Sequence, residues 1–209
     1  MFLRLAGGLV VRSRWRPYRP APGERVLVLR AGGAFPPGHP TTRLCLELLA
    51  EALPQRPVQR LADVGCGSGV LGLAAALLGV PVVAAVDLSR RAALTTLQNS
   101  RRAGCPRSMF VSQGSSECLR GPFDLVVANL PAAVQADKTE EFHRLAGPRG
   151  ALILSGFRDT QEEGLRAAYR ALGWECAVRR LRDAWAPELP PELSYTWAAW
   201  RLERRRESG

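Results

Sequence analysis

The chain has almost no lysine, little histidine and no long apolar run. Lys138 is its single lysine, and His39 and His143 are its only histidines. Five cysteines occur without a C-x-x-C pair, so the sequence predicts no metal site and free thiols in a reducing cytoplasm. No apolar run reaches the roughly 20 residues of a membrane span. Residues 1–11 lack the features of a signal peptide, so we expect a soluble, cytoplasmic protein without a membrane partner.

The positive charge of the chain is carried almost entirely by arginine. The formal net charge is +10, in a sequence that is also rich in Gly, Pro and Ala. A basic surface of this kind can bind RNA or another polyanion, but a codon bias of the whole genome would produce the same arginine content. Both explanations remain open at this point.

The spacing of apolar residues predicts an α/β fold. Residues 1–40 are expected to form an arm without a hydrophobic core of its own, with one short strand near 26–29. A helix capped by Thr41 or Thr42 is expected to follow and to end near Ala52. Beyond it, strands alternate with helices. The expected strands are 59–64, 82–87, 108–112, 123–128 and 150–155, and the expected helices are 69–79, 90–103, 134–146 and 159–172. Two further strands, 174–181 and 194–202, follow one another as a hairpin. We therefore expect a Rossmann-like, doubly wound, seven-stranded sheet, mostly parallel with a C-terminal antiparallel hairpin.

A glycine-rich turn joins the first of these strands to a helix. Gly65, Gly67 and Gly69 alternate with small residues, so the backbone can turn sharply and approach a ligand closely. The spacing differs from the G-x-G-x-x-G of dinucleotide folds, and Asp63 precedes it, which suits a cationic ligand such as S-adenosylmethionine better than a pyrophosphate. An ordinary tight strand-to-helix connection is the alternative.

Two polar residues follow neighbouring strands. Asp87 ends the second strand, where its carboxylate can accept both hydroxyls of a ribose. Either Asp87 or Ser89 can also cap the next helix, and both roles of Asp87 can hold at once. Asn129 ends the fourth strand, where it and Leu130 can aim carbonyl oxygens at an incoming amine. A plain strand-to-helix turn with Asn129 as its cap is the alternative.

Together these stretches resemble a class I S-adenosylmethionine-dependent methyltransferase. The closest resemblance is to the bacterial family that methylates a stalk-base protein of the large ribosomal subunit, and it covers about residues 22–180. The run 32–44, which reads GGAFPPGHPTTRL, is similar to the sequence that precedes the first helix of that family. Val127-Ala128-Asn129-Leu130 and Leu154-Ser155-Gly156 also match in order.

The resemblance implies a set of site residues. Phe35 and the Thr41-Thr42 pair are expected to close over the cofactor. The complete set of candidate cofactor-binding residues is Phe35, Thr41, Thr42, Asp63, Gly65, Cys66, Gly67, Gly69, Asp87, Leu88, Ser115 and Asn129. The candidate catalytic residues are Asn129 and Leu130, which would orient a neutral amine. His39 fits the loop as a buried or capping imidazole.

The sequence departs from the family pattern at three places. Pro36-Pro37 stands where the family has Gly-Thr, and Gly114-Ser115-Ser116 stands where it has Gly-Asp beside the adenine. Only about 20 residues precede the match, so we expect the N-terminal substrate domain of the family to be missing. The expected division is an arm with a cofactor-covering loop at 1–40, a methyltransferase domain at 41–203 and a basic tail at 204–209. Lysine methyltransferases that act on an electron-transfer flavoprotein are a second model.

The expected function is N-methylation of a lysine or another amine of a protein, with a ribosomal protein or the ribosome as partner. An RNA nucleobase-amine N-methyltransferase is the first alternative, suggested by Asn129-Leu130-Pro131 and by basic residues at both ends of the chain, Arg12, Arg14, Arg16, Arg19 and Arg204-Arg205-Arg206. A non-catalytic cofactor-binding module and a small-molecule methyltransferase are the others. The oligomeric state is left open.

Overall fold

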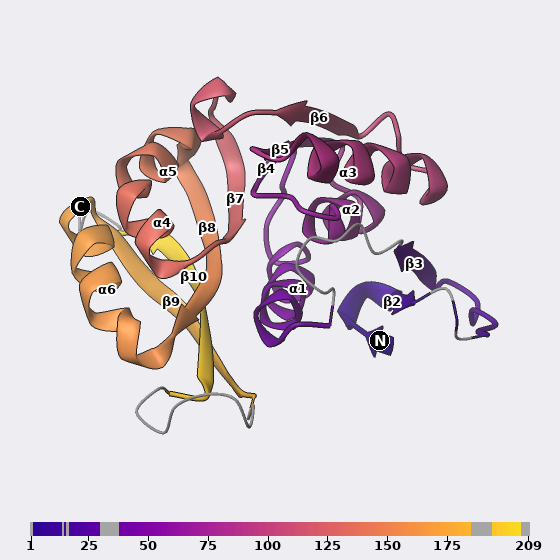
Figure 1. The fold of residues 1–209 in the computed structure, drawn as a ribbon, viewed down its shortest axis with the longest axis horizontal. Coiled ribbons are helices and arrows are strands. Elements are labelled where there is room, and N and C mark those ends of the chain that lie inside the picture. The colour runs from indigo at the N-terminus through magenta and orange to yellow at the C-terminus, as the bar shows by residue number, and fades with distance from the viewer. Residues whose placement is uncertain (1, 14, 16, 30–37, 185–193, 206–209) are drawn as a thin grey trace.

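A seven-stranded sheet forms the centre of the molecule (Figure 1). The computed structural model describes residues 2–13, 15, 17–29, 38–184 and 194–205. The strand order is β6-β5-β4-β7-β8-β10-β9. Only β10 runs antiparallel to its neighbours β8 and β9, which confirms the predicted fold class. The strands are β4 (Arg60–Val64), β5 (Val82–Asp87), β6 (Met109–Gln113), β7 (Phe123–Asn129), β8 (Ala146–Arg158), β9 (Trp174–Asp183) and β10 (Thr196–Arg204).

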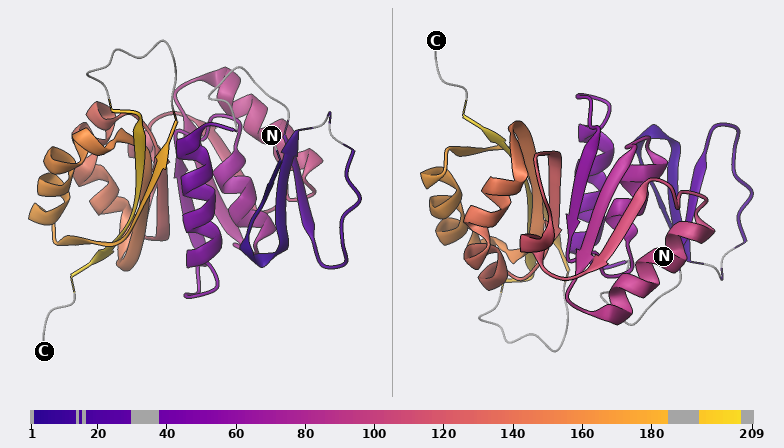
Figure 2. Two further views of the ribbon diagram at one scale, coloured as in Figure 1. Left: turned by 90° about the horizontal axis from the view of Figure 1, so that it is seen from below. Right: turned by 90° about the horizontal axis from the view of Figure 1, so that it is seen from above.

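Helices cover both faces of this sheet (Figure 2). The first face carries α1 (Pro40–Ala52), α2 (Val70–Leu77) and α3 (Arg90–Arg102), and the second carries α4 (Ala132–Asp137), α5 (Thr139–Leu145) and α6 (Glu162–Ala171). The single helix expected at 134–146 is in fact α4 and α5. Lys138 separates them, because its φ of −100° and ψ of 11° are not helical. Short 3₁₀ turns, η1 (Ala6–Gly8), η2 (Ser116–Cys118) and η3 (Asp159–Gln161), complete the elements.

The caps of α1 and α3 differ in how well the sequence predicts them. His39, not Thr41 or Thr42, caps α1: its Nδ1 accepts a hydrogen bond from Thr41 N at 3.3 Å, and Pro40 is the first helical residue. Proline is favoured there because its fixed φ suits the helix and its missing N–H costs nothing. The capping role expected for His39 is thus confirmed. Ser89 caps α3, as one of the two predicted alternatives, by accepting from Ala92 N at 3.4 Å.

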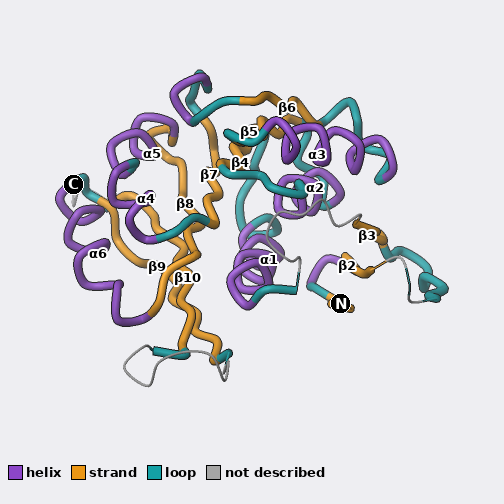
Figure 3. Tube along the Cα trace, viewed as in Figure 1, coloured by secondary structure: helices purple, strands orange, loops and turns teal. Residues whose placement is uncertain are grey.

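The first 29 residues form a small sheet of their own (Figure 3). β1 (Phe2–Arg4) pairs antiparallel with β2 (Leu9–Ser13), and β2 pairs parallel with β3 (Arg25–Leu29). The sequence predicts only the last of these strands. Leu9, Val11 and Leu27 are fully buried in the same apolar cluster as α1 and α2, so the expected arm is packed onto the main fold through a shared core.

The C-terminal strand lies two residues further along the chain than the sequence predicts, at 196–204 and not at 194–202. Arg204, expected to begin the basic tail, is the last residue of β10. Its guanidinium lies 4.6 Å from the centre of the Trp174 ring and donates hydrogen bonds to the carbonyls of His143 and Ala146. Within the described ranges, no helix is long and apolar enough to cross a membrane, and no three His, Cys, Asp or Glu side chains gather as a metal site requires.

A buried carboxylate joins α6 to the C-terminal hairpin. Glu162 on α6 is 6% exposed. It accepts a hydrogen bond from the indole N–H of Trp200 at 2.5 Å and a second from Nε of Arg179 at 3.0 Å. Both partners lie on the hairpin, Trp200 in β10 and Arg179 in β9. The carboxylate therefore holds the helix to both antiparallel strands.

We expect Glu162→Ala to lower the free energy of unfolding by about 2 kcal/mol, because it leaves the buried indole N–H of Trp200 without an acceptor. Urea denaturation followed by circular dichroism measures this loss. Glu163→Ala is the matched control on the same helix, since Glu163 is exposed, and it should change the stability by less than about 0.5 kcal/mol. Equal effects of the two substitutions would contradict the assignment.

Candidate active site

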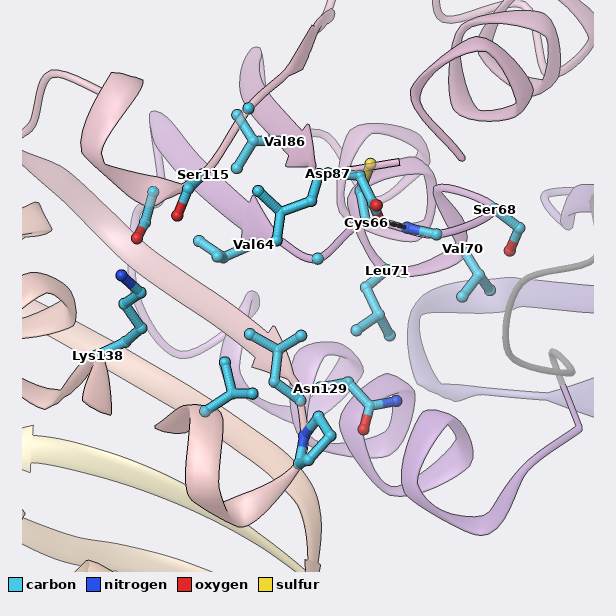
Figure 4. A pocket seen from close by; sticks show the side chains of 18 of the residues that line it. Val64, Cys66, Ser68, Val70, Leu71, Val86, Asp87, Ser115, Asn129 and Lys138 are labelled. Atoms are coloured by element: carbon cyan, nitrogen blue, oxygen red, sulfur yellow. Dashed lines mark hydrogen bonds between the residues drawn. The ribbon is translucent and has the colours of Figure 1, made fainter. Parts of the chain in front are cut away.

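A cavity of about 400 Å³ opens at the carboxyl ends of β4, β5 and β7. This is where the chain crosses from one half of the sheet to the other, since β4 lies between β5 and β7. Figure 4 shows Ser115 and Lys138 at one end of the cavity and Ser68 and Val70 at the other. Its walls are mostly apolar, with a few polar groups, as is usual for small-molecule sites. The lining residues are Thr42, Val64, Gly65, Cys66, Gly67, Ser68, Val70, Leu71, Val86, Asp87, Leu88, Gly114, Ser115, Ser116, Asn129, Leu130, Pro131, Val134 and Lys138.

The glycine-rich turn forms the floor between β4 and α2. Gly65, Gly67 and Gly69 have φ values of 76°, 57° and 81°, a region that side-chain-bearing residues avoid. A Cβ at Gly65 would also lie only 2.5 Å from Cδ2 of Leu130. Glycine at this position is therefore required twice, by the backbone conformation and by the close approach of the chain after β7.

Asp87 ties the end of β5 to this turn. One of its carboxylate oxygens accepts a hydrogen bond from Gly67 N at 2.9 Å, and the other accepts from Ser89 N at 2.8 Å. The carboxylate thus holds the glycine turn and the start of α3 at once. Each oxygen keeps a further acceptor position, and Asp87 lines the cavity, so it can also accept hydroxyl groups of a ligand.

Asn129 brings an unused acceptor into the cavity. Its Nδ2 donates to the hydroxyl of Thr42 at 3.3 Å, while its buried Oδ1 has no hydrogen-bond partner in the described part of the chain. A buried, unpaired amide oxygen is costly, and its usual explanation is a ligand or substrate group. The backbone carbonyl of Leu130, the other predicted acceptor, already accepts from Nε2 of Gln135 at 2.8 Å. The available acceptor is therefore the side chain of Asn129.

A lysine and two serines form the far end of the cavity. Ser115 and Ser116 come from the segment after β6, and Lys138 comes from the junction of α4 and α5. The ammonium of Lys138 forms a salt bridge with Glu117 and lies 3.5 Å from Asp137. Hydrogen bonding from Lys138 lowers the pKa of Glu117 to about 2. This ion pair links η2 to the junction of α4 and α5 at this end of the cavity.

The structure brings most of the predicted site residues together. Those that line the cavity are Thr42, Gly65, Cys66, Gly67, Asp87, Leu88, Ser115, Asn129 and Leu130. Three others do not reach it. The Thr41 hydroxyl contacts Nδ1 of His39 at 2.8 Å, Gly69 begins α2 against Thr96, and Asp63 is buried beneath the turn. Phe35 lies outside the described residues.

Asp63 differs most from its expected role. Its side chain is 1% exposed, and its Oδ2 accepts a hydrogen bond from Gly72 N, in the first turn of α2, at 2.9 Å. The carboxylate thus points beneath the glycine turn instead of into the cavity. Burial raises the pKa of Asp63 to about 7, and the nearby charge of Asp87 adds to this shift. The sequence places an acid at the end of the strand but does not show to which side it points.

Several lining residues are not predicted from the sequence. Val64, Val86 and Val134 look like ordinary core residues, and Ser68, Val70, Leu71, Gly114, Ser116 and Pro131 lie beside predicted positions. Lys138 is the most informative omission. That it is the only lysine of the chain was a usable signal, but its position inside an expected helix concealed it.

The comparisons with known proteins agree with this geometry. The family model of ribosomal protein L11 methyltransferase (PrmA) matches residues 3–187. The chain belongs to this family. The ribosomal protein L11 methyltransferase of Syntrophotalea carbinolica is 41% identical over 186 residues, which are 88% of this chain and 60% of the relative. The relative from Parasynechococcus marenigrum is 38% identical over 85% of this chain and 64% of its own length. The chain therefore spans less than two thirds of these curated relatives.

A solved structure shows the same relationship in three dimensions. The ribosomal protein L11 methylase of Lactobacillus delbrueckii subsp. bulgaricus superposes with a TM-score of 0.80 at 25% identity, covering 98% of both chains. These findings confirm the family resemblance and the methyltransferase fold that the motifs predict.

We expect Asp63→Asn to change how stability depends on pH. The folded-state pKa of about 7 exceeds the ordinary value of 3.8, so the folded protein holds this proton more tightly than the unfolded chain does. The wild type therefore loses stability relative to the variant as the pH rises from about 4 to 7, and the difference levels off above that range. Denaturant unfolding at intervals of pH measures it. Parallel curves for the two proteins would contradict the account.

Proposed function

We propose that the chain transfers a methyl group from S-adenosylmethionine to a lysine or another amine of a ribosomal protein. The observation that carries this proposal is the unpaired Oδ1 of Asn129, buried in the wall of the cavity that the glycine turn and Asp87 also line. A hydrogen-bond acceptor in the cavity wall suits an amine substrate, because an amine has N–H groups to donate. Membership of the family supports a ribosomal protein as the acceptor.

The residues present fit the proposed cofactor. The carboxylate of Asp87 can accept the two ribose hydroxyls, and Gly65 and Gly67 let the amino acid part approach the backbone. The N–H groups of this turn already bond to Val86 O and Asp87, so the turn offers carbonyl oxygens to the ligand. At the other end, Leu88 and Val134 offer apolar contact to a nucleobase, beside the hydroxyls of Ser115 and Ser116. A cavity of about 400 Å³ lies within the range of small-molecule sites, roughly 300–1,000 Å³.

The chain then has to position an amine and exclude water. When bound, S-adenosylmethionine supplies a methyl group that its sulfonium already activates. Asn129 Oδ1 accepts a hydrogen bond from an N–H of the amine, and this bond directs the nitrogen lone pair toward the middle of the cavity. The surrounding apolar wall lowers the pKa of a lysine that enters, which favours its neutral, nucleophilic form. Orientation of this kind can lower the activation barrier of a bimolecular reaction by roughly 7–11 kcal/mol. The lysine releases its proton to solvent as it enters the cavity, so the transfer step itself, in which the C–S bond breaks as the C–N bond forms, needs no dedicated base.

The same proposal extends to location and organisation. A ribosomal acceptor places the protein in the cytoplasm. Residues 41–203 hold every described element around the cavity, and we propose them as the methyltransferase domain. The small sheet of residues 2–29 packs against α2 and α3 at the side, as Figure 1 shows.

The test is transfer of labelled methyl groups from S-adenosylmethionine into a ribosome-containing extract, followed by proteinase or ribonuclease. We expect label that only proteinase removes, in a band of ribosomal protein. Asn129→Ala should lower kcat about 100-fold, because the amine is no longer aligned, with little change in cofactor affinity. Label that only ribonuclease removes would overturn the proposed acceptor. Unchanged kcat in the variant would overturn the role of Asn129.

A further inference from the structure

A segment beside the cavity carries a large share of the positive charge of the chain. Residues 88–116 contain five arginines and neither aspartate nor glutamate, so they carry +5 of the formal net charge of +10. The segment covers α3 and the edge strand β6, between Leu88 and Ser115 of the cavity wall. All five arginines are exposed: Arg90, Arg91, Arg101, Arg102 and Arg107.

Helical geometry aligns four of these arginines on one face of α3. Arg90 and Arg101 are 11 residues apart, close to three full turns, and so are Arg91 and Arg102. The buried residues Ala92, Thr96 and Asn99 face the core on the other side. The exposed face is therefore a basic stripe about 16 Å long, with an arginine pair at each end. We call these four arginines the α3 stripe.

The arginines of the α3 stripe differ in their partners from the arginines of strand β9. On that strand Arg179 pairs with Glu162, Arg180 with Glu51 and Arg182 with Glu47. Within the part of the chain that the structure describes, no guanidinium of the α3 stripe forms a salt bridge or a side-chain hydrogen bond. The stripe thus keeps its full charge available to a partner.

Stability of the helix does not explain the first pair. Arg90 and Arg91 occupy the first turn of α3, which contains no acidic residue. The helix dipole disfavours cations there, whereas Arg101 and Arg102 in the last turn are favoured. Codon bias explains arginine in general but not a cluster that is unpaired, aligned and placed against the dipole at one end.

We propose that the α3 stripe binds RNA through its phosphate backbone. Guanidinium groups bind phosphate oxygens through two parallel hydrogen bonds, and two arginine pairs about 16 Å apart can hold separate phosphates of one strand. An anionic membrane fits less well, because Leu94 is the only large apolar side chain exposed on α3 itself, and the exposed Leu88 and Phe110 lie outside the helix. The inference goes beyond the proposed methyl transfer, since binding of RNA is measured without cofactor or acceptor.

The test uses the full chain and a fluorescein-labelled, single-stranded RNA of mixed sequence, about 20 nucleotides long. Fluorescence polarisation gives Kd at several salt concentrations for the wild type and two double variants. Arg101→Gln with Arg102→Gln removes the end of the stripe that is farther from the cavity. Arg19→Gln with Arg25→Gln is the matched control, because it removes the same charge from two exposed arginines of the small N-terminal sheet region.

We expect the Arg101/Arg102 variant to bind RNA about tenfold more weakly. Loss of two phosphate contacts should make the slope of log K against log salt shallower by about 1.4. The control should keep the affinity and slope of the wild type. Titration with S-adenosylhomocysteine and thermal unfolding show whether each variant is still folded, so a failure here is distinguishable from a failure of the proposed function.

Three results would overturn the inference. The first is a wild type that does not bind the RNA, and the second is an equal loss of affinity in both double variants, which would reveal only an effect of total charge. The third is binding to phosphatidylserine vesicles as tight as binding to the RNA, with the same dependence on Arg101 and Arg102. That result would assign the stripe to membrane surfaces.

Discussion

The carboxylate of Asp87 is the interaction on which the active-site geometry depends. Its two oxygens accept Gly67 N and Ser89 N, which come from the glycine turn and from the cap of α3. Without this bridge, Gly67 N and Ser89 N would have no shared acceptor at the end of β5. With it, both lie along one side of the cavity, and the remaining acceptor positions of the same carboxylate face the ligand. Folding and binding therefore use one group.

Close backbone packing around Leu130 completes the opposite wall. Its side chain would lie 2.5 Å from a Cβ at Gly65, and its carbonyl oxygen would lie 2.3 Å from a Cβ at Gly156. Leu130, which follows β7, therefore packs between Gly65 of the turn after β4 and Gly156 of β8. This packing holds Asn129 at the end of β7. There its Nδ2 donates a hydrogen bond to the Thr42 hydroxyl, and its Oδ1 has no partner among the described residues. The three elements define where an amine can sit.

Alternating apolar patterns and glycine spacing predict the sheet, its hairpin and most of the cavity wall, because strand ends and tight turns depend on local sequence. Directions of side chains are decided by packing and are not predictable in this way. Asp63 contacts Gly72 under the turn, and Lys138 reaches the cavity from a break between helices that looks continuous in sequence. Likewise, Leu9 and Val11 belong to an apolar stretch in the sequence, and packing in one cluster with α1 and α2 makes them part of a buried strand.

The most direct test of the account is calorimetric titration of S-adenosylhomocysteine into the wild type, Asp87→Asn and Asp124→Asn. Asp124 is a matched control, because its Oδ2 also accepts two backbone N–H groups, those of Gln59 and Arg60, but at the amino ends of β7 and β4, away from the cavity. The account predicts that Asp87→Asn raises Kd about 10- to 100-fold, through loss of charge-assisted hydrogen bonds, while Asp124→Asn leaves it unchanged. Wild-type affinity in Asp87→Asn, or equal losses in both variants, would contradict it.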